Sequence, residues 1–267
     1  MIKAVVTGVA GRMGSRIVNV LSTSEGIMLG GALERKGQPL IGQDAGGPAG
    51  IPATGVKITD DLAAALRAGD VLIDFTSPEA SLLHLKTCAE QGRAAVIGST
   101  GFTKEHLAEV HAYVQKVPCV LSPNMSIGVN LCFKVLAEIA KTIGDDYDME
   151  IVEAHHRMKK DAPSGTAMKM AQVIAQAVNR NLDEVGVYAR KGMIGERTKK
   201  EIGIQTLRGG DIVGEHTVLF AGKGERIEIT HRAHSRDTFA AGAVRAAKWV
   251  VGKKPGLYDM MDVLGLK

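Results

Sequence analysis

The 267-residue chain contains few aromatic residues, and its charge is nearly balanced. Aromatic side chains make up only 4% of the sequence, too few for the stacking platforms that bind single-stranded nucleic acid. The formal net charge is only +4, whereas a protein that binds a phosphate backbone is expected to carry a stripe of Lys and Arg. We therefore expect no nucleic-acid partner and favour a protein that handles small anionic molecules.

Cysteines and long apolar runs are also scarce. The three cysteines, Cys88, Cys119 and Cys132, form no C-x-x-C pair, so neither a disulfide framework nor a zinc ribbon is expected. No other cluster has metal-ligand spacing, and we expect no metal site. No apolar run approaches the ~18 residues of a membrane span, and Arg12 comes too early for a secretory signal. We expect a cytoplasmic protein without a membrane partner.

The chain is long enough for roughly two domains, and its pattern changes after Pro123. Before that point, short continuous apolar runs such as 2–7 and 94–97 alternate with helical stretches, as in a doubly wound parallel sheet. After it, a helix at 129–143 is followed by strand-like runs, some alternating polar and apolar residues. The sequence predicts an α/β fold, a Rossmann-like sheet plus a smaller α+β domain within about 127–235.

Three local features of the first half give more detailed expectations. A helix is predicted at 12–21, directly after the first strand. Residues 35–55 carry five glycines before Gly55 and three prolines, which predicts a long surface loop. Thr59 or Asp60 is predicted to cap the next helix, and Pro78 and Gly92 to begin and end a later one.

A glycine motif with the spacing G-x-x-G-x-x-G follows the first strand, from Gly8 to Gly14. Glycines allow a tight turn and close backbone approach, and the N–H groups of the next helix can receive a pyrophosphate. Glu34 ends the second strand twenty positions past Gly14, where an acceptor for a ribose diol is expected. The motif predicts a dinucleotide site; the alternative is a tight strand–helix turn without a ligand.

Basic residues follow Glu34 and bear on the choice of cofactor. A carboxylate accepts from a free 2′-hydroxyl, whereas the guanidinium of Arg35 would pair with a 2′-phosphate. Carrying both suggests use of NAD and NADP, with Lys36 more simply explained as a solvated charge. Gly98–Thr100 and Ser122–Met125 follow two further strands, at the edge where ligands of open α/β sheets bind, although either stretch could be only a turn.

Candidate catalytic and binding residues are most concentrated between residues 153 and 166. His155 and His156 end a strand, a basic loop follows, and Ser164-Gly165-Thr166 opens a helix. Cations followed by a helix N-terminus form a natural receptor for carboxylates. Adjacent histidines on an extended chain point to opposite sides and cannot easily chelate one metal. From charge alone, a solvated basic loop remains the alternative.

The glycine motif, the histidine block and several further segments together form one set of motifs. They are Gly8-Val9-Ala10-Gly11-Arg12-Met13-Gly14, Asp74-Phe75-Thr76, Gly98-Ser99-Thr100-Gly101-Phe102, Asn124-Met125-Ser126-Ile127-Gly128-Val129-Asn130, Gly209-Gly210-Asp211-Ile212-Val213-Gly214-Glu215-His216, Glu228-Ile229-Thr230-His231 and, above all, Glu153-Ala154-His155-His156-Arg157 with Asp161-Ala162-Pro163-Ser164-Gly165-Thr166. Over essentially its whole length the chain resembles the 4-hydroxy-tetrahydrodipicolinate reductase (dihydrodipicolinate reductase) family of bacterial lysine and diaminopimelate synthesis.

The resemblance implies an organisation and a reaction. Residues 1–126 with 236–267 would form the dinucleotide-binding domain, because the last helix returns to it in this family. Residues 127–235 would bind substrate and build a homotetramer through a mixed sheet. The cofactor would be NADH or NADPH, and the reaction the reduction of 4-hydroxy-tetrahydrodipicolinate to tetrahydrodipicolinate with loss of water.

The resemblance also implies roles for individual residues. The cofactor site would be lined by Gly8, Val9, Ala10, Gly11, Arg12, Met13, Glu34, Arg35, Gly98, Ser99, Thr100, Ser122, Pro123, Asn124 and Met125. The substrate would be held by His156, Lys159, Gly165 and Thr166, with His155 and Lys159 as the proton-transfer groups. The family often has a basic residue where Ser77 stands and an aromatic one at Met125, which puts a cofactor contact by Ser77 in doubt.

Two other function classes deserve comparison. An aldehyde dehydrogenase with a cysteine nucleophile needs a loop cysteine beside a base, but Cys88 and Cys132 fall within predicted helices. A nicotinamide-dependent sensor without catalysis would share the glycine motif but has no use for a basic, dicarboxylate-binding loop.

Overall fold

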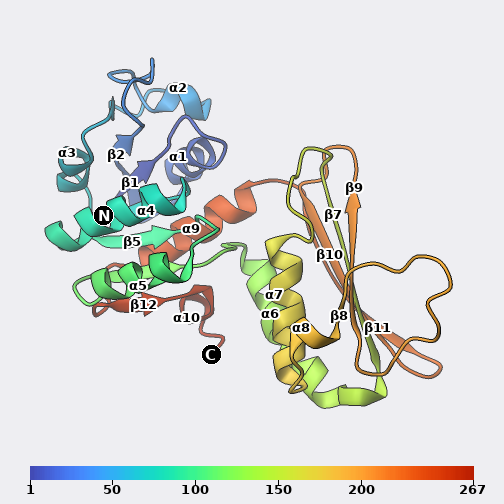
Figure 1. Ribbon diagram of the computed structural model, residues 1–267. Helices are drawn as coiled ribbons and strands as arrows, with labels where there is room; N and C mark the ends of the chain where they lie inside the picture. Colours follow the sequence, from blue (N-terminus) through green and yellow to red (C-terminus); the bar gives the residue numbers. More distant parts are fainter. The chain divides into compact units, whose positions relative to one another are not determined.

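The computed structural model describes all 267 residues and divides the chain into two compact units. The first comprises Met1–Ile127 and Arg236–Lys267, and the second Gly128–Ser235. Figure 1 shows a sheet with helices in each of them. The predicted α/β fold class, with a parallel sheet and a second, mixed sheet, is confirmed.

The first unit is built on a seven-stranded sheet in the order β12-β6-β5-β4-β1-β2-β3, in which every pairing is parallel. Its strands are β1 (Ile2–Thr7), β2 (Ile27–Leu33), β3 (Ile58–Thr59), β4 (Val71–Asp74), β5 (Ala94–Ile97), β6 (Pro118–Leu121) and β12 (Gly256–Tyr258). The chain order reverses on either side of β1, so the carboxyl ends of β1 and β4 form the switch point where ligands of such sheets bind.

Helices cover both faces of this sheet because its strands are apolar on both sides. Val6 and Ile73 pack on one side with helices α1 and α9, whereas Val5 and Leu72 pack on the other with α3, α4 and α5. The helices are α1 (Gly14–Ser22), α2 (Gly46–Ala49), α3 (Leu62–Arg67), α4 (Pro78–Gln91), α5 (Lys104–Tyr113), α9 (Asp237–Val250) and α10 (Met260–Leu264). This two-sided burial explains why the strands read as continuous apolar runs.

Three predicted helix starts are wrong by one or two residues; one of them is the helix predicted at 129–143, which begins at Ile127. Helix α1 begins at Gly14 rather than at residue 12, because the preceding residues form a turn in which the Gly11 N–H donates to the Gly8 carbonyl. Helix α3 is capped by Asp61, which accepts from the Ala64 N–H, and not by Thr59 or Asp60. Thr59 instead belongs to β3, paired with the end of β2.

The segment 35–55, predicted as a loop, contains the short helix α2. The Asp44 carboxylate holds this segment together by accepting hydrogen bonds from the N–H groups of Gly46, Thr54 and Gly55. A single carboxylate thus closes a glycine-rich stretch into an ordered turn, as Asp side chains do. The sequence pattern had also not revealed β12 and α10, both too short to show a period.

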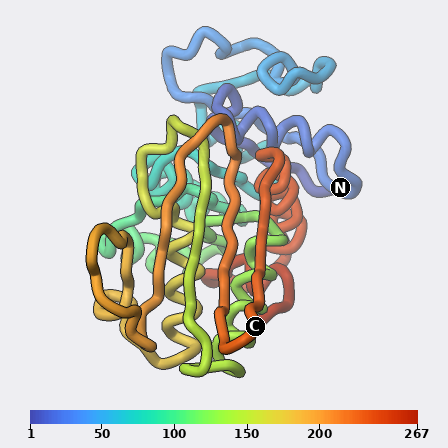
Figure 2. The backbone as a smooth tube through the Cα atoms, turned by 90° about the vertical axis from the view of Figure 1, so that its right-hand side faces the viewer, coloured from blue at the N-terminus to red at the C-terminus, as the bar shows by residue number.

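The second unit is a five-stranded mixed sheet in the order β11-β10-β7-β9-β8. Its elements are α6 (Ile127–Ile143), η1 (Gly144–Asp146), β7 (Asp148–His155), α7 (Gly165–Ala177), α8 (Leu182–Val185), β8 (Gly186–Val187), β9 (Ile202–Arg208), β10 (Gly214–Ala221) and β11 (Arg226–Ala233). Figure 2 shows its long strands running side by side. Helices α6 and α7 cover one face, where Ile151, Ile204 and Val218 are buried.

The alternation along β7 decides which side chains face the helices. Met149, Ile151, Glu153 and His155 are buried, and the residues between them are only half-buried. The inner face is therefore apolar under the helices and turns polar towards the end of the strand. No helix of the structure combines the length and apolar character needed to cross a membrane, and the cytoplasmic location stays a prediction.

Candidate active site

The turn after β1 in the first unit requires glycine at two positions, Gly8 and Gly14. Gly8 has a φ of +61°, and a Cβ on Gly14 would lie 2.1 Å from the Gly8 carbonyl oxygen. Helix α1 begins at Gly14, and no side chain caps its first N–H groups. The turn therefore offers an uncapped helix N-terminus and a backbone that a ligand can approach closely, which fits the pyrophosphate of a dinucleotide.

Glu34, directly after β2, is tied to this turn. One carboxylate oxygen accepts from the Ala10 N–H at 3.1 Å and the other from the Arg35 N–H at 3.0 Å. Only 9% of the residue is exposed. The structure thus brings together the glycine turn, Glu34 and Arg35, three parts of the predicted cofactor site.

A pocket of about 340 Å³ lies at this edge of the sheet. It is lined by Thr7, Gly8, Leu33, Glu34, Arg35, Lys36, Asp60, Leu62, Thr76, Ser77, Ala80, Leu83 and His84. These residues lie at or after the carboxyl ends of β1, β2, β3 and β4, on the edge where the sheet order reverses. Arg35 and Lys36 give the pocket cations beside the Glu34 carboxylate, as a ribose with or without a 2′-phosphate requires.

Sequence reasoning missed a buried histidine–carboxylate pair at this pocket. The His84 Nδ1 lies 2.7 Å from an Asp74 oxygen, and the Thr76 N–H and hydroxyl donate to the other. Burial alone would raise the pKa of Asp74, but the hydrogen bonds from His84 and Thr76 hold it below its ordinary value. The Asp74-Phe75-Thr76 segment was the only sequence signal for this arrangement.

The two remaining predicted cofactor stretches follow β5 and β6 at the same edge. A Cβ on Gly98 would lie 2.2 Å from the Phe75 ring, and the Ser99 hydroxyl bonds to that of Ser81. The Ser122 hydroxyl donates to the carbonyl of Asn124. The Ser99 and Ser122 hydroxyls are used within the fold, so these two positions offer mainly backbone groups to a ligand. Neither stretch contributes to the pocket beside Glu34.

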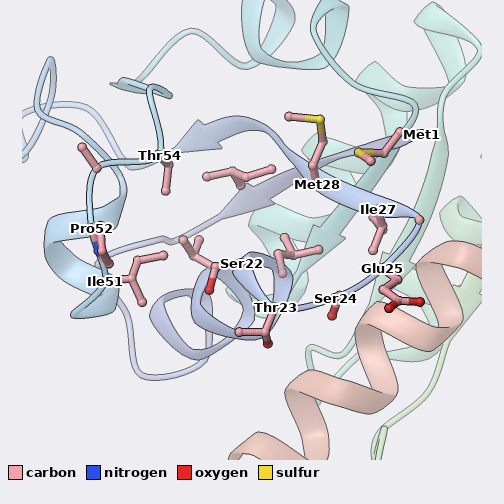
Figure 3. A pocket seen from close by; sticks show the side chains of 15 residues that line it. Met1, Ser22, Thr23, Ser24, Glu25, Ile27, Met28, Ile51, Pro52 and Thr54 are labelled. Carbon is pink, nitrogen blue, oxygen red and sulfur yellow. The ribbon is translucent and has the colours of Figure 1, made fainter.

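A second cavity of about 830 Å³, shown in Figure 3, lies at the opposite, amino-terminal ends of β1 and β2. Met1, Ile27, Met28 and Ile51 make it largely apolar. Glu25 is the only charged side chain among its lining residues. Its lining carries no cationic side chain, unlike the pocket beside Glu34.

In the second unit, the polar end of β7 forms the centre of a hydrogen-bond network. The Glu153 carboxylate accepts from His155 Nδ1 at 2.6 Å and from the Ser164 N–H at 2.9 Å. Arg208, at the end of β9, donates to both oxygens at 2.8 and 2.9 Å. Burial alone would raise the pKa of Glu153, but these donors lower it to about 2.

The basic loop that follows β7 is held by backbone and side-chain contacts. The N–H groups of His156 and Arg157 donate to the carbonyls of Ile212 and Gly210, in the loop between β9 and β10. The Lys159 ammonium lies 2.9 Å from both oxygens of Asp161. Burial would raise the pKa of Asp161, but its hydrogen bond from Lys159 lowers it. Sequence reasoning did not foresee this partner.

The loop ends at the N-terminus of helix α7. Ser164 caps the helix by accepting from the Ala167 N–H, and Gly165 and Thr166 are its first two residues. The Ser164 hydroxyl also lies 3.0 Å from Nε2 of the buried His216. Burial lowers the pKa of His216 to about 3, so this imidazole is neutral. The unit thus joins a basic loop to a helix N-terminus, an arrangement that can bind carboxylates.

The cysteines are poor nucleophiles in this structure. Cys88 and Cys119 are buried, and burial raises the pKa of both thiols. Cys132 lies within α6, and burial raises its thiol pKa too. Because the thiolate is the reactive form, these observations argue against an aldehyde dehydrogenase with a cysteine nucleophile.

Comparison with known proteins identifies the family. The family profiles described as "Dihydrodipicolinate reductase, N-terminus" and "Dihydrodipicolinate reductase, C-terminus" match residues 2–125 and 128–264. The 4-hydroxy-tetrahydrodipicolinate reductase of Geotalea uraniireducens is 61% identical over 267 residues, all of both chains. A dipicolinate-bound dihydrodipicolinate reductase from Paenisporosarcina sp. TG-14 is 26% identical, with a TM-score of 0.75 over 98% of each chain.

A more distant structure shares only the fold. The amine dehydrogenase of Mycobacterium smegmatis is 18% identical, with a TM-score of 0.60 over 96% of this chain and 94% of its own. By contrast, the two family profiles together cover nearly the whole chain, and the full-length relative is 61% identical over all of it. The chain therefore belongs to the dihydrodipicolinate reductase family.

Proposed function

We propose that the chain acts through a cofactor site beside Glu34 and a dicarboxylate receptor formed by the basic loop and helix α7. Its reaction is the NAD(P)H-dependent reduction of 4-hydroxy-tetrahydrodipicolinate to tetrahydrodipicolinate with loss of water, in lysine and diaminopimelate synthesis. One observation supports the assignment of the receptor: the loop that contains Lys159 leads directly into the N-terminus of α7.

The substrate is a cyclic dicarboxylate, and we assign its binding to His156, Lys159, Gly165 and Thr166. The exposed Gly165 at the start of α7 has no Cβ contact within 4 Å, so a carboxylate can approach the helix N–H groups. Lys159 supplies a cation from the same loop. The dipicolinate bound to the Paenisporosarcina relative is a ligand with two carboxylates, in agreement with such a receptor.

Proton transfer is assigned to His155 and Lys159. The substrate ring becomes electron-rich as it is reduced, so a nearby acid must supply a proton. The Asp161 carboxylate balances the charge of the Lys159 ammonium and holds it at the loop surface, with 20% of its side chain exposed. His155 is 8% exposed at the end of β7, with Nδ1 bound to Glu153.

The cofactor is NADH or NADPH, and when bound its nicotinamide supplies the hydride. We assign its binding to the glycine turn, Glu34, Arg35 and the stretches after β5 and β6. The residues of this site are Gly8, Val9, Ala10, Gly11, Arg12, Met13, Glu34, Arg35, Gly98, Ser99, Thr100, Ser122, Pro123, Asn124 and Met125. Glycines at the turn leave the backbone accessible, and Glu34 and Arg35 meet the ribose end.

We also propose that the chain forms a homotetramer through the outer face of the second unit's sheet. The apolar side chains of Val152, Leu207 and Leu219 lie on that face and are partly exposed, Leu207 by 56%. Leu207→Glu should lower the mass measured by light scattering. Leu83→Glu, at a similarly exposed leucine on α4, should leave it unchanged. A wild-type monomer would rule the tetramer out.

The activity is tested with purified protein and enzymatically generated 4-hydroxy-tetrahydrodipicolinate. Loss of the near-ultraviolet absorbance of the reduced nicotinamide should occur only when this substrate is present. Comparable turnover of simple 2-keto acids or aldehydes would indicate another dehydrogenase class. Cofactor binding without turnover of any of them would indicate a sensor.

A further inference from the structure

Glu153 is the most enclosed charged side chain in the second unit. It has no exposed surface and lies on the inner face of β7, in register with Thr206 of β9 and His216 of β10. A carboxylate in such a position is costly unless each oxygen receives hydrogen bonds. Direct contact with a ligand does not explain this buried carboxylate, because Glu153 has no exposed surface.

Both oxygens of Glu153 are fully engaged. Oε2 accepts from His155 Nδ1 and Arg208 Nη1, while Oε1 accepts from Arg208 Nη2, the Ser164 N–H and the Thr206 hydroxyl. Because the carboxylate is ionised and only accepts, Nδ1 of His155 must carry a proton. The nitrogen left for proton exchange is therefore Nε2.

The surroundings of Nε2 agree with this orientation. A Cβ on Gly214 would lie 3.0 Å from His155 Nε2, so the glycine leaves space beside that nitrogen. The His216 ring meets the His155 ring edge to face, with 5.1 Å between centroids, and limits its rotation. The ring of His155 is thus fixed on one side by a carboxylate and on another by packing.

The same network also holds the loop that carries Lys159. Arg208 Nη2 donates to the carbonyl of Asp161 as well as to Glu153, and the Ser164 N–H closes the far end of the loop on the same carboxylate. One buried charge therefore connects His155 before the loop, Asp161 within it and Ser164 after it.

We propose that Glu153 is a positioning residue: paired with Arg208, it fixes the Nδ1–H form of His155 and the loop of Lys159 for proton transfer. This inference rests on the proposed role of His155. A carboxylate that orients an imidazole in this way is a known device of acid–base sites. Glu153 itself touches no substrate.

The first test is nuclear magnetic resonance of wild-type protein with ¹⁵N-labelled histidine. Nδ1 of His155 should give the signal of a protonated nitrogen at every pH examined, whatever the state of Nε2. A His155 with unprotonated Nδ1 and protonated Nε2 would overturn the proposal. This measurement requires neither activity nor a variant that folds.

The second test is kinetic and uses Glu153→Gln. Its amide has one acceptor oxygen for donors that now occupy two, so His155 and Arg208 compete for it. We expect kcat to fall roughly 10- to 100-fold, short of the ~10²–10⁴ that a general acid contributes, with the substrate KM within about threefold. A kcat within about twofold of wild type, or a KM that rises as much as kcat falls, would overturn the positioning role.

Glu150→Gln is the matched control. Glu150 lies three residues earlier on the same strand and is also bound by arginines, Arg190 and Arg197, but it faces away from His155. This variant should keep the kcat of wild type. The failures are separable: inactive wild-type protein contradicts the proposed function, whereas active wild type with an unaffected Glu153→Gln contradicts only this inference.

Discussion

The ammonium of Lys159 lies 2.9 Å from each carboxylate oxygen of Asp161, two residues further along the same loop. The neighbouring Lys160 is exposed. Two adjacent lysines of equal charge therefore occupy different environments. This difference makes them a matched pair for testing whether the loop supplies a specific acid or only positive charge.

We predict that Lys159→Met lowers kcat by ~10²–10⁴, or roughly 3–5 kcal/mol of barrier, because a positioned acid is lost. Substrate affinity should fall much less, since His156, Gly165 and Thr166 remain. Steady-state kinetics of Lys159→Met and Lys160→Met give the comparison, and Lys160→Met should stay within a few-fold of wild type. If both variants behave alike, or if KM rises with kcat nearly unchanged, the loop is an electrostatic receptor and His155 becomes the better candidate acid.

A planar pyridine-2,6-dicarboxylate should inhibit competitively with the substrate. It presents two carboxylates to the same loop and helix N-terminus, and a relative of known structure binds it. Initial rates at several substrate and inhibitor concentrations distinguish the modes. Competition with the reduced nicotinamide instead of the substrate would contradict a receptor in the second unit.

The sequence predicted much of the first unit because its strands are buried on both sides. The strand Ala94–Ile97 and the helix Pro78–Gln91 have the predicted bounds, the latter because Pro78 opens it and Gly92, at a φ of +66°, ends it. Helix α2 escaped prediction because its order comes from the Asp44 carboxylate rather than from any apolar period.

The candidate site was only partly predictable. Its local parts, the glycine turn and the block containing His155 and Lys159, follow from short motifs. The pairing of Glu153 with Arg208 joins residues 55 positions apart, and no periodicity in the sequence announces it. Arg208 is the last residue of β9, and its place on the inner face became clear only from the register of β7 and β9.

Arg35→Ala should weaken NADPH binding more than NADH binding. Arg35 lines the pocket beside Glu34, and a charge-assisted hydrogen bond to a 2′-phosphate contributes ~1.5–3 kcal/mol, about one to two decades of affinity. Fluorescence titration with both cofactors measures the ratio. Equal losses for both would remove Arg35 from the 2′-phosphate role and leave Lys36, in the same pocket, as the candidate.

The last prediction concerns stability and His216. Its pKa is depressed by burial to about 3, against ~6.5 for an ordinary histidine. Between these values the unfolded chain binds a proton that the folded chain does not, so unfolding becomes more favourable as the pH falls. The contribution is fully present above pH ~6.5 and is lost progressively towards pH 3.

His216→Gln cannot titrate, so its unfolding free energy should depend less steeply on pH than that of wild type across this window. Denaturant unfolding at several pH values measures the difference in unfolding free energy between wild type and His216→Gln. This difference should become smaller as the pH falls, because wild type loses the stability that a neutral His216 provides. The exposed His234 provides the control, since His234→Gln should follow the wild-type curve. Parallel curves for wild type and His216→Gln would show that His216 is not held neutral by the fold.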